Sequence, residues 1–223
     1  MKTFQIAIDG PAGAGKSTIA GMVAKQKQYI YVDTGAMYRA VALYLIENNI
    51  AGDDHDRIVL ACKNINITIE YMDGEQAVLL NGKNVNAYIR TPEVSAMASL
   101  SSKDPAIREH LKGIQKQLAN THSVVMDGRD IGTVILPNAD VKIFLTASVE
   151  VRAKRRYDEM VAKKMECDFE ALKTEIAKRD KQDMEREIAP LKQAEDAVLL
   201  DSSDMTISEV TDRILEICNN KGM

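Results

Sequence analysis

Five short apolar runs are spaced along the chain, and most of the longer segments between them have helical periodicity. The runs are FQIAI at 4–8, YIYV at 29–32, SVVM at 123–126, VKIFL at 141–145 and AVLL at 197–200. Runs of this length are typical of strands buried on both faces, and helical segments between strands are typical of parallel connections. The pattern predicts an α/β fold with a five-stranded parallel sheet flanked by helices.

Four of the apolar runs are followed by an aspartate at or near the end of the predicted strand. Open α/β sheets bind their ligands beyond the carboxyl ends of the strands, so we expect a site at this edge of the sheet. The four residues are Asp9, Asp33, Asp127 and Asp201.

The stretch 65–86 departs from this rhythm. Ile65, Ile67, Ile69 and Tyr71 alternate with polar residues, and the pairs Asp73-Gly74 and Asn81-Gly82 are typical of hairpin turns. This pattern predicts a small three-stranded antiparallel insert, to which we assign residues 62–90 of a single domain spanning 1–223.

Three further segments have the composition of helix starts. TPEV at 91 and DPAI at 104 each place a proline in a first helical turn behind a capping residue. TISEV at 206–210 is a capping box formed by Thr206 and Glu209, and we expect the helix that follows it to close the fold.

The segment GPAGAGKST follows the first apolar run and precedes a helical pattern that contains Ile19 and Val23. Its glycines allow backbone N–H groups to point at an anion, at the positive end of the following helix. The segment fits G-x-x-x-x-G-K-[ST], in which the lysine reaches the β/γ-phosphates and the hydroxyl, here Ser17, binds Mg²⁺. A glycine-rich surface turn is the alternative, and the strand–turn–helix context favours the nucleotide site. Its residues are Gly10, Pro11, Ala12, Gly13, Ala14, Gly15, Lys16, Ser17 and Thr18.

Composition limits the other classes of ligand. The net charge of −4 argues against a broad surface for polymeric nucleic acid, while a local arginine cluster could still bind a small phosphorylated ligand. The three cysteines are widely spaced, which suits reduced thiols in the cytoplasm, and neither they nor the isolated histidines form a metal-binding pattern. No leader and no apolar stretch of membrane-spanning length is visible, so we expect a cytoplasmic protein that does not bind membranes.

Two arginines follow predicted strands. DTGAMYR places Thr34 and Arg39 at a strand-to-helix connection, where the guanidinium could reach an acceptor phosphate or could simply be exposed on a helix. DGRDIGT offers Arg129 between Asp127 and Asp130, and a plain turn held by an Arg–Asp pair would have the same sequence.

Two further clusters have helical spacing. In KRDKQDMEREIAP, Arg179, Asp183 and Arg186 fall on one face of a helix that is expected to end before Pro190. In VRAKRR, Arg152 and Arg156 share a face beside Arg155. From spacing alone, a solvated helix face is the favoured interpretation of both clusters.

The combination of segments changes that interpretation. GPAGAGKST, DTGAMYR, IRTPEVS, DGRDIGT followed by a proline, VKIFLTASVEVRAKRR and KRDKQDMEREIAPL occur in this order over nearly the whole chain, and together they resemble the bacterial cytidylate (CMP) kinases. Members of that family often carry Gly-Lys-Gly-Thr or Asp-Ser-Gly-Ala where this chain has Gly-Lys-Ser-Thr and Asp-Thr-Gly-Ala. Both differences keep or add a hydroxyl.

The resemblance implies a nucleoside-monophosphate-kinase core with an enlarged monophosphate-binding insert. It implies ATP-dependent phosphorylation of CMP, and with it dCMP, by direct transfer with Mg²⁺ accompanying ATP. Lys16, Arg39, Arg129 and Arg179 would be the catalytic residues. CMP would be bound by phosphate contacts from Arg39, Arg129, Arg179 and Arg186, together with Thr34, by ribose contacts from Asp183, and by cytosine contacts from Ser99, Arg108 and Asp130. Arg152, Arg155 and Arg156 would lead into a short lid at 153–170, with Arg155 and Arg156 binding ATP.

Two alternatives remain. One is a kinase of another small acceptor, such as UMP, AMP, shikimate or a coenzyme precursor. The other is a GTP-dependent switch or a non-catalytic nucleotide sensor, against which the absence of an N-K-x-D segment weighs. We expect a monomer whose partners are small nucleotides.

Overall fold

The computed structural model describes residues 3–72 and 75–222 and divides into two compact units. The first unit contains the described residues up to Tyr31 and those from His122 onwards, and the second contains Val32–Thr121. The predicted turn at Asp73-Gly74 lies outside the described residues. None of the helices in the described part of the chain combines the length and the apolar character that a membrane span needs.

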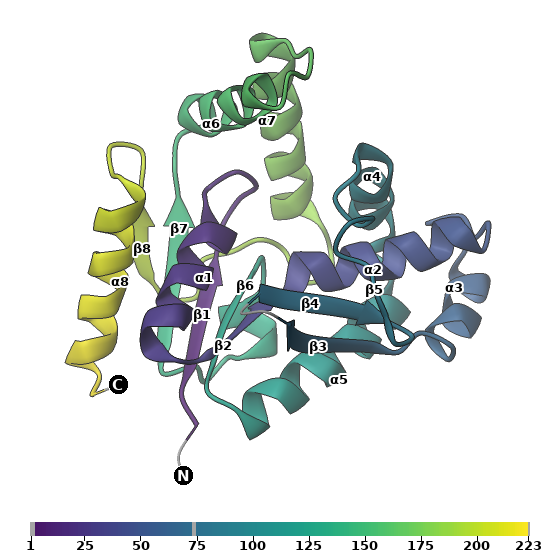
Figure 1. Cartoon of the computed structure of the whole chain (residues 1–223), viewed down its shortest axis with the longest axis horizontal. Helices are drawn as coiled ribbons and strands as arrows, with labels where there is room; N and C mark the ends of the chain where they lie inside the picture. Colours follow the sequence, from purple (N-terminus) through teal and green to yellow (C-terminus); the bar gives the residue numbers. More distant parts are fainter. Residues whose placement is uncertain (1–2, 73–74, 223) are drawn as a thin grey trace. The chain divides into compact units, whose positions relative to one another are not determined.

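The five apolar runs form the five strands of one sheet, as predicted (Figure 1). The sheet order is β2-β6-β1-β7-β8, and the pairings of β1 with β6, β1 with β7, and β7 with β8 are parallel. The strands are β1 (Gln5–Asp9), β2 (Ile30–Asp33), β6 (Val124–Gly128), β7 (Val141–Thr146) and β8 (Val198–Asp201). The central position of β1 explains why its residues Ile6, Ala7 and Ile8 are fully buried.

Two helices of the first unit pack against each other and share one core with the sheet. α1 (Lys16–Lys27) buries Ile19 and Val23, the apolar positions noted in the sequence. α8 (Ile207–Asn220) begins at the predicted capping box of Thr206 and Glu209 and buries Ile214 in the same core. This core therefore fixes the start of α1 relative to β1.

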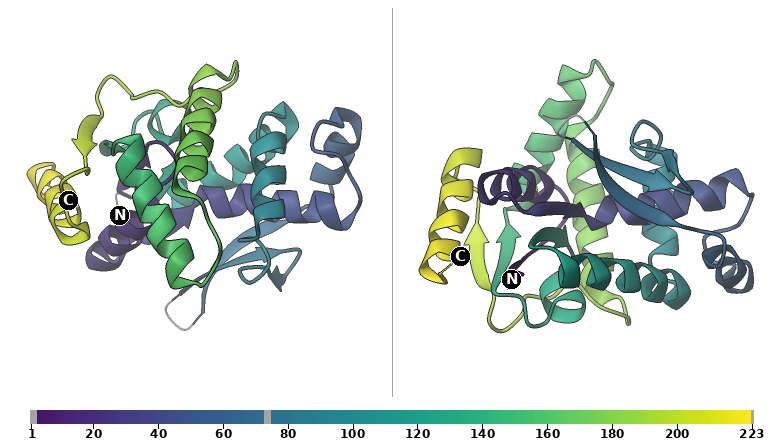
Figure 2. Two further views of the ribbon diagram at one scale, coloured as in Figure 1. Left: turned by 90° about the horizontal axis from the view of Figure 1, so that it is seen from above. Right: turned by 60° about the horizontal axis from the view of Figure 1, so that its bottom comes forward.

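Two other helices of the first unit, α6 (Val149–Ala162) and α7 (Phe169–Glu185), lie side by side (Figure 2). The rings of Tyr157 on α6 and Phe169 on α7 meet edge to face, with centroids 6.1 Å apart. A short π-helical turn, η1 (Ile131–Ile135), follows β6.

The second unit combines helices with the predicted three-stranded antiparallel sheet. β3 (Ile67–Met72) pairs with β4 (Glu75–Leu80), and β4 pairs with β5 (Lys83–Asn84). At the turn before β5, Asn81 and Gly82 have φ values of 49° and 81°, as the Asn-Gly pair predicts. The helices are α2 (Thr34–Glu47), α3 (His55–Cys62), α4 (Pro92–Ser101) and α5 (Pro105–Thr121), and α4 and α5 begin at the predicted prolines.

The turn between β1 and α1 depends on a glycine at its first position. Gly10 has φ +148°, and a Cβ atom there would lie 1.9 Å from the carbonyl oxygen of Leu145 on β7. A backbone oxygen in a paired strand cannot move aside, so only glycine fits.

We therefore expect Gly10→Ala to reduce the free energy of unfolding by at least about 3 kcal/mol. Gly21→Ala is the matched control, because Gly21 lies inside α1 with open space around its Cα, and alanine there should stabilise the protein by about 0.5–1 kcal/mol. Urea unfolding of both variants provides the measurement. Similar stability of the two variants would contradict the close approach of β1 and β7.

Candidate active site

The turn between β1 and α1 has the backbone conformation of an anion nest. Gly13 and Gly15 have φ values of 76° and 87°, in the left-handed region that favours glycine. α1 starts directly after Gly15, and a glycine at the N-cap has no side chain that could accept a hydrogen bond from the first turn of the helix. The N–H groups of that turn are therefore directed at a ligand position, where a phosphate would be stabilised by the helix dipole.

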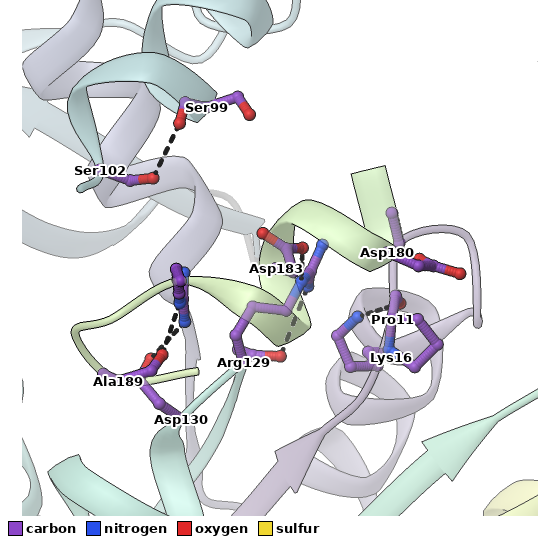
Figure 3. Close-up of polar contacts among 12 residues, drawn as sticks. Pro11, Lys16, Ser99, Ser102, Arg129, Asp130, Asp180, Asp183 and Ala189 are labelled. Atoms are coloured by element: carbon purple, nitrogen blue, oxygen red, sulfur yellow. Dashed lines mark hydrogen bonds and ion pairs between the residues drawn. The ribbon is translucent and has the colours of Figure 1, made fainter. Parts of the chain in front are cut away.

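Lys16, the first residue of α1, is a buried cation with 6% of its surface exposed. Its Nζ donates a hydrogen bond to the carbonyl oxygen of Pro11 at 2.7 Å (Figure 3). Burial lowers the pKa of Lys16 to about 7, and the charge of Arg129 and, to a smaller extent, that of Arg179 lower it as well, while Asp127 and Asp9 act in the opposite direction. The ammonium thus lies near both positive and negative side chains, and the net effect of burial and charge disfavours its protonated form.

The last residue of β1, Asp9, is a buried carboxyl group, and burial shifts its pKa upward rather than downward. Burial raises the pKa of Asp9 to about 6, although the hydrogen bonds that it accepts from the backbone of Gly132 and Ile131 work against this. Between pH 3.8 and 6 the native state therefore binds more protons than the unfolded state at Asp9, and this group lowers stability as pH rises. Between pH 7 and 10.5 the native state binds fewer protons at Lys16, so that group raises stability as pH rises. Both buried charges cost stability near neutral pH.

A hydroxyl and a carboxylate meet beside the nest. Ser17 Oγ donates to Asp127 Oδ2 at 3.3 Å, and the Tyr31 hydroxyl donates to the other oxygen of Asp127 at 2.8 Å. Oxygen ligands of this kind suit Mg²⁺, which is commonly held by one or two protein groups together with substrate phosphates. Among the described residues no group of three or more His, Cys, Asp or Glu side chains is placed to hold a metal ion.

Arg129 and Asp183 form an ion pair that sequence spacing did not identify. Arg129 Nε donates to Asp183 Oδ2 at 2.9 Å, and their side chains are 20% and 16% exposed (Figure 3). Arg129 thus contacts α7 in addition to its own turn, where it donates to the carbonyl of Gly128. The solvated-face interpretation of this part of α7 is wrong at Asp183, because the residue is partly buried against Arg129.

Arg186 does not belong to the α7 helix, contrary to the prediction. α7 ends at Glu185, and Arg186 is extended with ψ 140°. A helix continued through Pro190 would bring the proline ring against the carbonyl of Arg186, and Ala189 before it has φ 49°. The side chain of Arg186 still turns to this site, because it donates to the carbonyl of Ala189 and lies 3.6 Å from Asp130.

The arginines of α6 differ from one another. Arg152 is 3% exposed and donates to the carbonyls of Ala147 at 2.8 Å and Ala12 at 3.0 Å, and to Asp180 of α7 at 2.6 Å. It therefore ties the nest to both helices, and the solvated-face interpretation is wrong for it. Arg155 donates to the carbonyl and hydroxyl oxygens of Ser202 after β8, whereas Arg156 is 44% exposed near Glu175.

In the second unit, Asp33 organises the start of α2. Its carboxylate accepts from the N–H of Ala36 at 2.8 Å and forms ion pairs with Arg39 at 3.3 Å and Arg90 at 3.4 Å. Thr34 is buried beside it, and the Arg39 side chain is 21% exposed, which differs from the freely exposed helix arginine considered above. Sequence reasoning missed Arg90, whose only signal was its place before the proline of IRTPEVS.

The remaining predicted residues of the second unit lie on α4 and α5. Arg108 is 8% exposed, donates to the Ser102 carbonyl at 3.4 Å and lies over the ring of Tyr38 at 5.9 Å. The carbonyl of Ser99 accepts from the Ser102 hydroxyl at 3.2 Å (Figure 3).

The predicted site residues are thus divided between the units. The first unit contains the nest with Lys16 and Ser17. It also contains two ion pairs of predicted site residues, Arg129 with Asp183 and Arg186 with Asp130. The charges of Arg129 and Arg179 both act on Lys16. The second unit holds Thr34, Arg39, Ser99 and Arg108.

A five-stranded sheet whose central strand leads through a phosphate nest into a helix defines a P-loop protein of the small-kinase fold. Solved structures at 14% identity share this fold. They include an uncharacterized protein from Eubacterium ventriosum, with a TM-score of 0.56 and coverage of 97% of this chain and 99% of that one. They also include a shikimate kinase from Bacteroides thetaiotaomicron, with a TM-score of 0.50 and coverage of 97% and 98%.

Sequence comparison narrows the class. The family model described as cytidylate kinase matches residues 6–220. A cytidylate kinase from Geobacillus sp. strain WCH70 is 51% identical over 98% of this chain and 97% of its own, and one from Bacillus subtilis strain 168 is 49% identical over 99% and 98%. The chain belongs to the cytidylate kinase family.

The role of Arg152 as an anchor predicts a large effect on stability. Arg152→Met removes a buried cation and leaves Asp180 and two carbonyls without their donor, so we expect a loss of about 3–5 kcal/mol. Arg213→Met is the control: it removes the exposed pair with Glu216 and should change stability by no more than about 0.5 kcal/mol. Thermal unfolding by calorimetry compares the variants, and an equally small change for both would contradict the anchoring role.

Proposed function

We propose that this chain transfers the γ-phosphoryl group of ATP to the phosphate of CMP, and likewise of dCMP. The observation that supports this most directly is the position of the Lys16 ammonium, buried at a phosphate nest and under the influence of both Arg129 and Arg179. Transfer between two anions requires positive charge from the donor and acceptor sides at one place. Family membership identifies CMP as the acceptor, because the relatives at about 50% identity are named cytidylate kinases.

On the donor side, the nest binds the ATP phosphates through backbone N–H groups. Lys16 exchanges the carbonyl of Pro11 for phosphate oxygens and stabilises the charge that develops during transfer. Ser17 and Asp127 would hold Mg²⁺, which when bound neutralises charge on the phosphates. Residues 153–170 act as a lid that excludes water, with Arg155 and Arg156 on the ATP phosphates.

On the acceptor side, each unit contributes its own set of residues. In the first unit, Arg129, Arg179 and Arg186 neutralise the CMP phosphate, Asp183 accepts from the ribose hydroxyls, and Asp130 accepts from the cytosine amino group. In the second unit, the phosphate contacts come from Arg39 and Thr34, and the base contacts come from Ser99 and Arg108. The acceptor phosphate oxygen is itself the nucleophile, so the protein positions and neutralises without forming a covalent intermediate.

The direct test is ADP release from ATP over a panel of CMP, dCMP, UMP, AMP and shikimate. We expect efficient turnover with CMP and dCMP, and a loss of several orders of magnitude in Lys16→Ala with the fold retained. Higher efficiency with another acceptor would assign a different kinase activity. ATP binding without acceptor-dependent ADP release would indicate a nucleotide-binding module.

A substitution at Asp183 should affect binding of the acceptor CMP more than binding of the donor ATP. Asp183→Ala should raise the KM for CMP about tenfold or more and change the KM for ATP less than about threefold, because the lost contact is to the acceptor ribose. Glu185→Ala, two residues further along α7, removes a carboxylate that is 66% exposed, and it should leave both constants unchanged. Equal losses for both nucleotides in Asp183→Ala would argue that the residue acts only through its pair with Arg129.

Asp130 predicts base selectivity. A carboxylate can accept from the N4 amino group of cytosine, whereas uracil presents an acceptor at the same position. Asp130→Asn should narrow the ratio of kcat/KM for CMP to that for UMP by about tenfold or more. Steady-state kinetics with both nucleotides decides this, and an unchanged ratio would place base recognition elsewhere.

A further inference from the structure

The carboxylate of Asp9 caps a helical turn that belongs to another part of the first unit. One oxygen of Asp9 accepts from the backbone N–H of Ile131 at 2.8 Å, and the other accepts from that of Gly132 at 2.7 Å. These are the first two residues of η1, whose leading N–H groups have no partner within the turn itself. Asp9 is 5% exposed, so these contacts are sheltered from water.

Asp9 itself has a fixed position. It ends the central strand, with its Cα in register with Gly128 of β6 and Phe144 of β7, and the next residue, Gly10, packs against the carbonyl of Leu145. Arg129 and Asp130 are the only residues between Gly128, which β1 holds by pairing, and Ile131, which Asp9 holds by its side chain. The two residues are therefore clamped at both ends.

This arrangement also bears on the side chain of Asp130, which is 5% exposed. Asp130 is the N-cap residue of η1, and aspartate at that position commonly accepts from the N–H groups of its own first turn. Here the Asp130 side chain makes no such bond: the N–H of Gly132 donates to Asp9 instead, and the Asp130 carboxylate lies 3.6 Å from Arg186. Capping by Asp9 from β1 thus takes the place of local capping by Asp130.

The chemistry of the contact explains why a carboxylate suits this buried position. Two backbone N–H groups need two acceptors, and a carboxylate provides both. An amide would place an NH₂ group against one of the donors, and an apolar side chain would leave both unpaired. The raised pKa of Asp9 shows that burying this carboxylate is costly, and the two hydrogen bonds offset part of that cost.

We propose that Asp9 is a positioning residue for acceptor binding, which holds Arg129 and Asp130 in place by capping η1 from the strand that leads into the nest. The proposal rests on the proposed function for its kinetic consequences, and on the contacts of Asp9 alone for its structural ones.

The first experiment needs no substrate. Amide hydrogen exchange by NMR should show Ile131 and Gly132 exchanging about tenfold or more faster in Asp9→Asn than in the native chain, with Val125 and Met126 of β6 unchanged. Unchanged exchange at Ile131 and Gly132 would overturn the proposal. This result is independent of whether CMP is the acceptor.

The second experiment measures kinetics in Asp9→Asn, Asp130→Asn and the double variant. Asp9→Asn should raise the KM for CMP about tenfold while the KM for ATP changes less than about threefold, and it should narrow the CMP-to-UMP ratio as Asp130→Asn does. The double variant should have the same CMP-to-UMP ratio as Asp130→Asn alone, because Asp9 is proposed to affect this ratio through Asp130. Additive effects, or equal losses for ATP and CMP, would contradict the proposal.

Gly132→Ala provides a second variant that retains the charge of Asp9. A Cβ atom at Gly132 would lie 3.3 Å from Asp9 Oδ2 and 3.2 Å from Lys142 Cδ, so it disturbs the same contact from the other side. It should reproduce the CMP-selective loss, whereas an effect of Asp9 through the charge of Lys16 would leave Gly132→Ala close to the native chain. Asp196→Asn removes an exposed carboxylate paired with Lys142. As the control, it should alter neither the KM for CMP nor the KM for ATP.

Discussion

The structure depends on holding a lysine ammonium in a buried place at the start of α1. Lys16 has the Pro11 carbonyl as its hydrogen-bond partner, and burial together with the charge of Arg129 lowers its pKa to about 7. Removing a charge from water is costly unless a partner compensates for it. On the function proposed above, the phosphates of a bound nucleotide would provide that compensation.

The end of β1 connects the nest with the turn that carries Arg129 and Asp130. Gly10 begins the nest and cannot carry a side chain because of Leu145, while the preceding Asp9 holds the turn that follows Arg129 and Asp130. A single strand end therefore fixes both the nest and the turn after Arg129 and Asp130, which we propose to bind the donor and the acceptor. Arg152 adds a second connection, since it joins Ala12 of the nest to Asp180, one residue after Arg179 on α7. Precise placement matters here because transfer requires the reacting groups to be in line.

The sequence predicts those features that depend on neighbours along the chain. The nest, the five strands, the Thr206 capping box and the Asn81-Gly82 turn are each encoded within a few residues, and all were found. The contacts of Arg129 with Asp183 and of Asp9 with Gly132 join residues 54 and 123 positions apart, so no local pattern reports them. The solvated-face interpretation failed for Arg152 because helical spacing shows which residues share a face but does not show what packs against that face.

Proton uptake on nucleotide binding tests the central claim most directly. Binding of the magnesium complex of a non-hydrolysable ATP analogue is measured by calorimetry in buffers of different ionisation enthalpy. Burial lowers the pKa of Lys16 to about 7 in the free protein, so a larger share of its side chain is neutral at pH 8 than at pH 6. The account predicts proton uptake at pH 8 that is clearly larger than the uptake at pH 6, and that is absent at pH 8 in Lys16→Met. Binding at pH 8 without proton uptake by the native chain would contradict it.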